Sequence, residues 1–353
     1  MRNNKLFRIG VVALSIVLVA CAGGSSDEAG CPVIEDRKIN VVATTPMVGE
    51  FVSQVGGDNI NLTVIMPPEA DPHTYEPAPQ DAGTIADADL VFYTGLKYEP
   101  AAVIKLLENS ACSTEVLAEV GENVFPIEFK EGGHDDHGDH DDHDEEGHDD
   151  EEGHDDEEGH DDEEGHDDHD GHEGHGHGAF DPHFWFDPNR VAYATEYIES
   201  KLVEFDPNNA SSYETAGSAY TGELKGLTGQ VSDLISTVPS QNRKLITTHE
   251  SLGYLEAKFG LEVLSTIIPS LDSANEISPA QLVDVIDVIE DNNVKVIFIE
   301  AEAPSVYAET IVAETGIKAV EGLWVETLKE GQSYPDFLIS AVELIVENLR
   351  NTD

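Results

Sequence analysis

Basic residues are scarce in this chain. Only 18 lysines and arginines stand against 72 aspartates and glutamates, so the formal net charge is −54 at pH 7. Such a surface repels nucleic acid and anionic membranes and attracts cations, which excludes a role in binding DNA or RNA. The imbalance is greatest in residues 131–178, which hold 25 acidic residues and 12 histidines but no lysine or arginine.

Long hydrophobic runs are also lacking. The apolar run at residues 9–20 is too short to cross a hydrocarbon core of about 30 Å. Basic residues precede it and small residues follow it, as in a secretory signal peptide. Its end, Leu18-Val19-Ala20-Cys21, resembles a bacterial lipobox. We therefore expect residues 1–21 to direct export, Cys21 to carry a membrane lipid anchor on the periplasmic or extracellular face, and residues 22–37 to form a flexible tether. An ordinary signal peptide is the alternative.

Cysteine is rare, with three residues in all. Cys31 and Cys112 remain beside Cys21, and in an oxidising compartment they could form a disulfide; two free thiols are the alternative. Neither lies in a CxxC motif, so metal binding through thiolates is not expected.

Residues 132–178 contain no aliphatic or aromatic residue, and the hexapeptide Glu-Glu-Gly-His-Asp-Asp occurs four times in tandem over residues 145–168. Such a segment cannot bury a core, so we predict a disordered loop. Neutral imidazole binds zinc, copper and nickel, and carboxylates attract divalent cations. We interpret the loop as a weak metal collector with many sites; an acidic linker with incidental histidines is the alternative. The histidines of the four repeats are His148, His154, His160 and His166.

The sequence on either side of the loop alternates between strand and helix patterns. This alternation predicts α/β folding, with parallel sheets covered on both faces. About 330 mature residues exceed one average domain, so we expect two lobes. The expected strands are 38–45, 61–66, 90–94 and 124–129 in the first half, and 244–248, 262–266 and 294–300 in the second. Helices are expected from Pro46, at 80–88 and 99–107, and from Pro279, where Ser278 provides the cap.

Residues 208–238 carry apolar side chains every three or four positions, which predicts one long helix. Four glycines within it each cost up to about 1 kcal/mol relative to alanine, so the helix requires tertiary packing. We expect it to connect an N-terminal lobe, residues 38–207 with the loop 131–178, to a C-terminal lobe, residues 239–353.

Only three histidines lie outside the loop: His73, His183 and His249. Each is expected where a strand gives way to a loop, which is where α/β proteins bind ligands. Asp71 and Asp181 stand two residues before the first two, and they could bond the second ring nitrogen of each imidazole. Solvated turn residues are the alternative for both aspartates.

Together, the lipobox, the histidine-rich loop and three short motifs resemble one protein family. The motifs are Asp71-Pro-His-Thr-Tyr-Glu76, Asp181-Pro-His-Phe-Trp-Phe-Asp187 and Thr248-His-Glu-Ser251. The family comprises the metal-binding substrate-binding lipoproteins of ABC transporters (cluster A-I, or cluster 9), and the chain is most similar to its zinc branch. The resemblance implies two α/β lobes joined by a long rigid helix, with the metal in the cleft between the lobes.

The resemblance also implies a set of metal ligands: His73 and His183 from the first lobe and His249 from the second. Manganese-binding relatives tend to have a carboxylate at the place of His249, and three imidazoles suit tetrahedral Zn²⁺ better than Mn²⁺. The fourth ligand of the family is usually an aspartate, whose place is taken here by Glu326. Glu300, at the end of an expected strand, or a water molecule are the alternatives.

The expected function is therefore capture of Zn²⁺ and its delivery, by a monomeric protein, to a membrane permease driven by an ATPase. Binding of manganese or another divalent metal is an alternative, as is a metal-buffering or adhesin lipoprotein. A zinc hydrolase could also use three histidines and a bound water. The sequence has no H-E-x-x-H motif, so we expect no enzymatic activity.

Overall fold

A computed structural model describes residues 31, 34, 37–129, 180–303 and 305–350 of the chain. The predicted signal peptide, Cys21 and the metal-collecting loop lie outside these described residues. The loop histidines His148, His154, His160 and His166 are among the positions left out.

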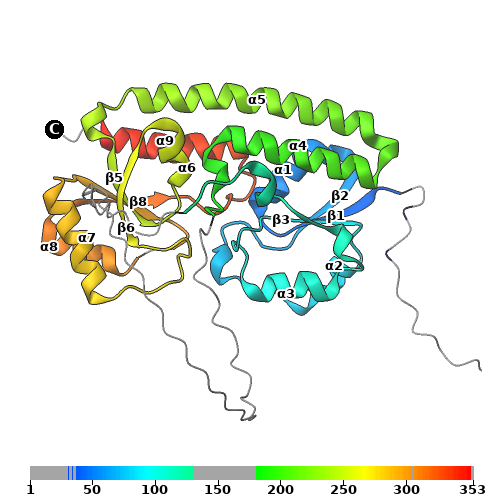
Figure 1. Ribbon diagram of the computed structural model, residues 1–353, viewed down its shortest axis with the longest axis horizontal. Coiled ribbons are helices and arrows are strands. Elements are labelled where there is room, and N and C mark those ends of the chain that lie inside the picture. Colours follow the sequence, from blue (N-terminus) through cyan, green and yellow to red (C-terminus); the bar gives the residue numbers. More distant parts are fainter. Residues whose placement is uncertain (1–30, 32–33, 35–36, 130–179, 304, 351–353) are drawn as a thin grey trace, which may run out of the picture.

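The N-terminal lobe is built on a parallel sheet of four strands in the order β2-β1-β3-β4. Helices α2 and α3 cover one face, and α1 and α4 lie on the opposite side (Figure 1). The strands are β1 (Ile39–Ala43), β2 (Ile60–Val64), β3 (Leu90–Tyr93) and β4 (Leu117–Glu119), and the helices are α1 (Pro46–Gly56), α2 (Pro79–Ala86), α3 (Ala101–Ser110) and α4 (Pro188–Phe205).

The C-terminal lobe repeats this plan with the strand order β6-β5-β7-β8, again all parallel. The strands are β5 (Lys244–His249), β6 (Glu262–Ile268), β7 (Val296–Glu300) and β8 (Lys318–Leu323), and the helices are α6 (Gly253–Phe259), α7 (Pro279–Asp291), α8 (Tyr307–Thr315) and α9 (Tyr334–Leu349). The predicted fold class, two parallel-sheet α/β lobes with a helical connection, is confirmed.

Helix α5 (Ala210–Ser236) runs along one side of the molecule across both lobes (Figure 1). It packs on α1 and α4 of the first lobe and on α9 of the second. Its buried residues belong to one hydrophobic core that also includes strands of both sheets. The lobes are therefore joined by packed side chains as well as by the chain itself. Within the residues described, no helix combines the length and apolar character needed to cross a bilayer.

Local sequence signals explain where several helices begin. Thr45 precedes α1, and its hydroxyl accepts a hydrogen bond from the backbone N–H of Val48, while Pro46 occupies the first turn. Ser278 and Gln281 form a reciprocal capping box at the start of α7. Such caps satisfy amide groups that lack a partner within the helix.

The expected strand at residues 124–129 is wrong. The outer strand of this sheet is β4, and Val124 instead ends a short 3-10 helix, η4 (Gly121–Val124). Phe125 then adopts a left-handed backbone conformation, with φ of 53°, which ends any strand geometry. Only Glu128 pairs with a strand-like neighbour, through an isolated antiparallel bridge to Phe180.

A disulfide links Cys31 to Cys112. It ties the segment before β1 to the turn that follows α3, so the first described residue is attached covalently to the N-terminal lobe. The pairing corresponds to the first of the two alternatives that the sequence left open.

Candidate metal centre

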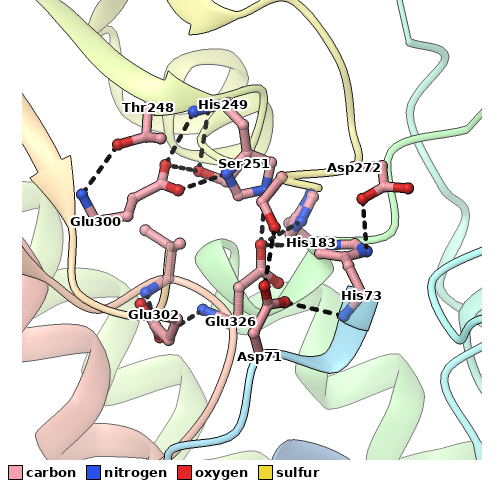
Figure 2. A network of polar contacts seen from close by, with 12 residues as sticks. Asp71, His73, His183, Thr248, His249, Ser251, Asp272, Glu300, Glu302 and Glu326 are labelled. Atoms are coloured by element: carbon pink, nitrogen blue, oxygen red, sulfur yellow. Dashed lines mark hydrogen bonds and ion pairs between the residues drawn. The ribbon is translucent and has the colours of Figure 1, made fainter. Parts of the chain in front are cut away.

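Three histidines and one glutamate from four separate segments meet between the lobes. His73 lies in the 3-10 helix η2 (Pro72–Thr74), and His183 immediately precedes η5 (Phe184–Phe186). His249 is the last residue of β5, and Glu326 follows β8. One potential ligand atom from each of the four lies within 4.8 Å of all the others. Figure 2 shows their side chains directed toward a common point.

The converging atoms are Nε2 of each imidazole and Oε1 of the glutamate. Glu326 Oε1 lies 3.4 Å from Nε2 of His73, 3.3 Å from that of His183 and 2.6 Å from that of His249. All four atoms are buried, and none has a hydrogen-bond partner. Leaving buried polar atoms unpaired costs about 1–3 kcal/mol each. This observation indicates that a ligand completes the site.

The second ring nitrogen of each histidine faces a carboxylate. His183 Nδ1 lies 2.8 Å from Asp181 Oδ1, and His249 Nδ1 lies 2.5 Å from Glu300 Oε2. For His73, the nearest carboxylate is that of Asp272, at 4.0 Å. Carboxylates at this position fix the tautomer and orientation of an imidazole, so that Nε2 presents its lone pair to a metal.

The expected contact of Asp181 with its neighbouring ring is therefore present, but that of Asp71 is not. Asp71 Oδ1 instead accepts a hydrogen bond of 3.0 Å from the backbone N–H of His73 and caps η2. Asp71 thus fixes the backbone conformation of the loop that carries His73. The carboxylate that faces the His73 ring nitrogen is that of Asp272, which belongs to the other lobe.

The Thr248-His-Glu-Ser251 motif holds Glu300 in place. Glu300 Oε1 accepts hydrogen bonds from the backbone N–H of His249 and from the Ser251 hydroxyl, at 3.2 Å each. The backbone N–H of Glu300 donates to Thr248 Oγ1 at 3.0 Å. The Glu300 carboxylate therefore lies on the Nδ1 side of His249, and none of its atoms belongs to the group of four converging ligand atoms.

The loop that carries Glu326 is clamped from both lobes. Glu302 Oε1 accepts the backbone N–H groups of three successive residues, 325–327, at 3.1, 3.0 and 3.3 Å. From the first lobe, Trp185 Nε1 donates to the carbonyl of Val325 at 2.8 Å. The Tyr98 hydroxyl lies 2.9 Å from both the carbonyl oxygen and Oε2 of Glu326.

The electrostatics of the site follow from burial and mutual charge. Burial would raise the pKa of Glu326, but the surrounding histidines outweigh it and lower that pKa well below its usual range. Burial by itself would lower the pKa of His183. The negative charges of Glu326 and Asp181 outweigh burial and raise this pKa to about 9. Burial, reinforced by repulsion from Glu326, raises the pKa of Glu302 to about 8.

Sequence reasoning did not identify Tyr98, Glu302 or Asp272 as part of the site. Tyr98 follows β3 in a turn that begins with Gly95, and a polar aromatic residue just beyond a strand end was the available signal. Glu302 lies two residues beyond β7 and carries the same kind of signal. Asp272 lies in the segment after β6, where several polar residues occur and none stands out.

The donor set fits a small divalent cation. A tetrahedral zinc ion with bonds of about 2.0–2.1 Å separates its ligand atoms by about 3.3 Å. Two of the three distances from Glu326 Oε1 to the imidazole nitrogens, 3.3 and 3.4 Å, match this separation. Three nitrogen donors and one oxygen donor suit zinc better than metals that prefer oxygen.

Comparison of the sequence with protein families gives one match over most of the chain. Residues 41–348 match the family described as zinc-uptake complex component A, periplasmic (ZnuA). The chain is 27% identical over 360 residues to the manganese ABC transporter substrate-binding lipoprotein PsaA of Streptococcus mitis, covering 98% of this chain and 99% of that protein. It is 26% identical to the metal ABC transporter substrate-binding lipoprotein FimA of Streptococcus parasanguinis, covering 96% of each.

Solved structures share the fold. The periplasmic zinc-binding protein TroA of Treponema pallidum superposes with a TM-score of 0.69 at 20% identity, covering 89% of this chain and all of that one. Fe(III)-bound YtgA of Chlamydia trachomatis gives a TM-score of 0.68 at 21% identity, covering 88% and 98% of the two chains. At these identities the likeness concerns the fold alone.

Proposed function

Because this chain belongs to the family of periplasmic zinc-uptake complex component A, we propose that it captures Zn²⁺ outside the cytoplasm and delivers it to an ABC importer. The chain is a substrate-binding component of a metal ABC importer, a class of solute-binding proteins rather than enzymes.

The choice of zinc rests on the donor set of this chain, since similar proteins are named for manganese, zinc and iron. The observation that carries the proposal is the convergence of three imidazole nitrogens and one carboxylate oxygen, all buried and without a hydrogen-bond partner. Zinc accepts four such ligands in tetrahedral geometry, whereas manganese favours oxygen donors and higher coordination. We assign His73, His183, His249 and Glu326 as the ligands.

Capture without catalysis follows from the same geometry. Four protein atoms fill a tetrahedral zinc shell, and a closed shell leaves no position for an activated water, which a zinc hydrolase requires. Release of the ion then depends on the transport partner, a permease with its ATPase. Export and anchoring through Cys21 would hold the monomeric protein at the membrane surface beside that permease.

Residues 131–178 would supply the site with zinc. The described chain leaves the N-terminal lobe at Phe129 and returns at Phe180, three residues before His183, and Glu128 pairs with Phe180 at this point. Both ends of the histidine-rich segment are thus attached beside the metal centre. Imidazole and carboxylate groups at high local density raise the local concentration of zinc. A role of the segment in sensing excess zinc is the alternative within this proposal.

Calorimetric zinc titration with chelator competition tests the proposal on residues 22–353, with and without residues 132–178. We expect one tight site that survives the deletion and several weaker sites that are lost with it. His249→Ala in the deleted protein should abolish the tight site. Loss of all binding on deletion would show that the four-residue centre does not bind zinc and would favour a metal-buffering lipoprotein.

Uptake assays in cells separate collection from sensing. If the segment collects zinc, the deletion should slow uptake when zinc is scarce and have little effect when zinc is abundant. Normal uptake at low zinc, combined with unregulated uptake at high zinc, would favour the sensing role.

A further inference from the structure

Tyr98 reaches across from the N-terminal lobe to the glutamate of the metal centre. It follows β3, is 1% exposed, and its hydroxyl lies 2.9 Å from Oε2 of Glu326. The same hydroxyl lies 2.9 Å from the carbonyl oxygen of Glu326. It therefore contacts both the side chain and the backbone of a proposed ligand that belongs to the other lobe.

The two carboxylate oxygens of Glu326 consequently have different environments. Oε1 faces the three imidazole nitrogens and has no hydrogen-bond partner, whereas Oε2 is paired with the Tyr98 hydroxyl. A phenol is a donor at neutral pH. The carboxylate is thus presented to the centre through one oxygen.

The turn that carries Tyr98 is fixed in an unusual conformation. Gly95, Leu96 and Lys97 have φ values of 78°, 54° and 65°, in a region that non-glycine residues rarely adopt. Glu99 holds the turn from within, because its carboxylate accepts the backbone N–H groups of Thr94 and Gly95 at 2.6 and 2.9 Å. Strain of this kind persists where the surroundings enforce it and is concentrated at functional sites.

The ring of Tyr98 is also confined. It makes edge-to-face contacts with His73 at 5.1 Å and with Trp185 at 5.2 Å between ring centroids. These ring contacts and the burial of the side chain restrict the movement of the hydroxyl away from Glu326. The surrounding side chains therefore hold the Tyr98 hydroxyl in its contact with Oε2 of Glu326.

We propose that Tyr98 determines metal specificity by restricting Glu326 to a single ligating oxygen and so keeping the centre four-coordinate. A carboxylate that binds through both oxygens would give a fifth donor and more oxygen character, which suits Mn²⁺. Occupying Oε2 with a phenol removes this option and leaves the tetrahedral arrangement that zinc accepts. The inference rests on the proposed function, since it concerns the same four ligands.

The test compares Tyr98→Phe with the unsubstituted protein in competitive titrations with Zn²⁺ and Mn²⁺. Tyr98→Phe keeps the ring and frees Oε2. Changes in groups that support metal ligands typically alter affinity about 10–100-fold, and we expect the ratio of zinc to manganese affinity to fall by about tenfold or more. Tyr334→Phe is the matched control, because that buried hydroxyl donates only to the carbonyl of Trp185, at 2.7 Å.

A spectroscopic measurement distinguishes a coordination effect from a loss of packing. Co²⁺ in a tetrahedral site absorbs visible light much more strongly than Co²⁺ with five or six ligands. We expect strong absorption for the unsubstituted protein and Tyr334→Phe, and weaker absorption for Tyr98→Phe. An unchanged affinity ratio with an unchanged cobalt spectrum in Tyr98→Phe would overturn the proposal.

Glu326→Asp provides a second approach, and it can be measured alone where Tyr98→Phe folds poorly, because it also separates the carboxylate from Tyr98 and should also lower the ratio of zinc to manganese affinity. It withdraws the carboxylate from Tyr98 by one methylene group, so adding Tyr98→Phe should then change the affinity ratio little. Equal effects of Tyr98→Phe in both backgrounds would contradict coupling through this contact. Failure of the proposed function would give a different result from failure of this inference. In that case the unsubstituted protein itself would have no tight zinc site for His249→Ala to remove.

Discussion

At the scale of single residues, each imidazole of the centre uses its two nitrogens for different purposes. Nε2 faces the common point, and Nδ1 faces a carboxylate at 2.5 Å for His249, 2.8 Å for His183 and 4.0 Å for His73. A close, buried carboxylate increases the basicity of the ring as a ligand and fixes its orientation. The three supporting carboxylates therefore differ in how much they contribute.

This difference gives a prediction for Glu300. The side chains of Glu300 and His249 are fully buried, whereas the side chain of Asp272 is 49% exposed. Glu300→Gln should therefore weaken zinc binding by about 10–100-fold, and Asp272→Asn by much less. Isothermal titration with a competing chelator measures both. Equal losses in the two variants would mean that the Glu300 carboxylate has no special role in orienting His249.

Some residues of the site could be predicted from sequence and others could not. Asp181 stands two residues before His183, which made it a candidate partner of the ring, and it makes the contact. Asp71 has the same spacing to His73 but bonds the backbone N–H instead, so spacing suggested both contacts and could not decide between them. The contact of Tyr98 with Glu326 spans 228 positions, and that of Glu300 with His249 spans 51. Such pairs depend on how whole strands are ordered in a sheet. No local pattern encodes that order.

At the scale of elements, periodicity predicted the interior of the fold better than its edges. Strands β1 and β5 are buried along almost their whole length, and their apolar runs were clear. Strand β8 alternates exposed and buried positions irregularly, and β4 has three residues, so neither gave a signal. The boundaries of α5, Ala210–Ser236, lie within two residues of the predicted limits.

The glycines of α5 provide a prediction at this scale. Gly226 lies in the exposed part of the helix, and a Cβ atom built there meets nothing within 4 Å. Gly226→Ala should raise the free energy of unfolding by about 0.5–1 kcal/mol, because glycine is the poorer helix former.

In α1, a Cβ on Gly49 would lie 2.6 Å from Val64 Cγ2, so Gly49→Ala should destabilise the protein. Denaturant titration of the two variants measures both changes, and stabilisation by Gly49→Ala would show that α1 can move away from β2.

At the scale of the whole molecule, the proposed metal centre and the hydrophobic core connect the same two lobes. His73 and His183 belong to the N-terminal lobe and His249 and Glu326 to the C-terminal lobe, while one hydrophobic core continues through α5 from one sheet to the other. Moving the two lobes far apart would separate packed apolar side chains. The fold therefore favours small rearrangements on metal binding over a large hinge motion.

This arrangement predicts that zinc stabilises the protein as a unit. A ligand that binds only the folded state, at a free concentration 100 times its Kd, adds about 2.7 kcal/mol to stability. For domains of 150–250 residues, this corresponds to a rise in Tm of about 5–10 °C. Because the ligands come from both lobes, we expect a single calorimetric transition that moves upward with zinc and returns to its original position when a chelator removes the metal.

The control for this shift is His249→Ala, measured in the protein without residues 132–178 so that weak sites do not contribute. The variant should show almost no rise in Tm with zinc, whereas Gly226→Ala in the same background should show the full rise. Two transitions, with only one responding to zinc, would mean that the lobes unfold independently and that the ion is held within one of them. A single transition that responds to zinc would instead show that the two lobes unfold together and that zinc stabilises both. This result is expected for an ion whose ligands come from both lobes and whose release requires their contact to loosen.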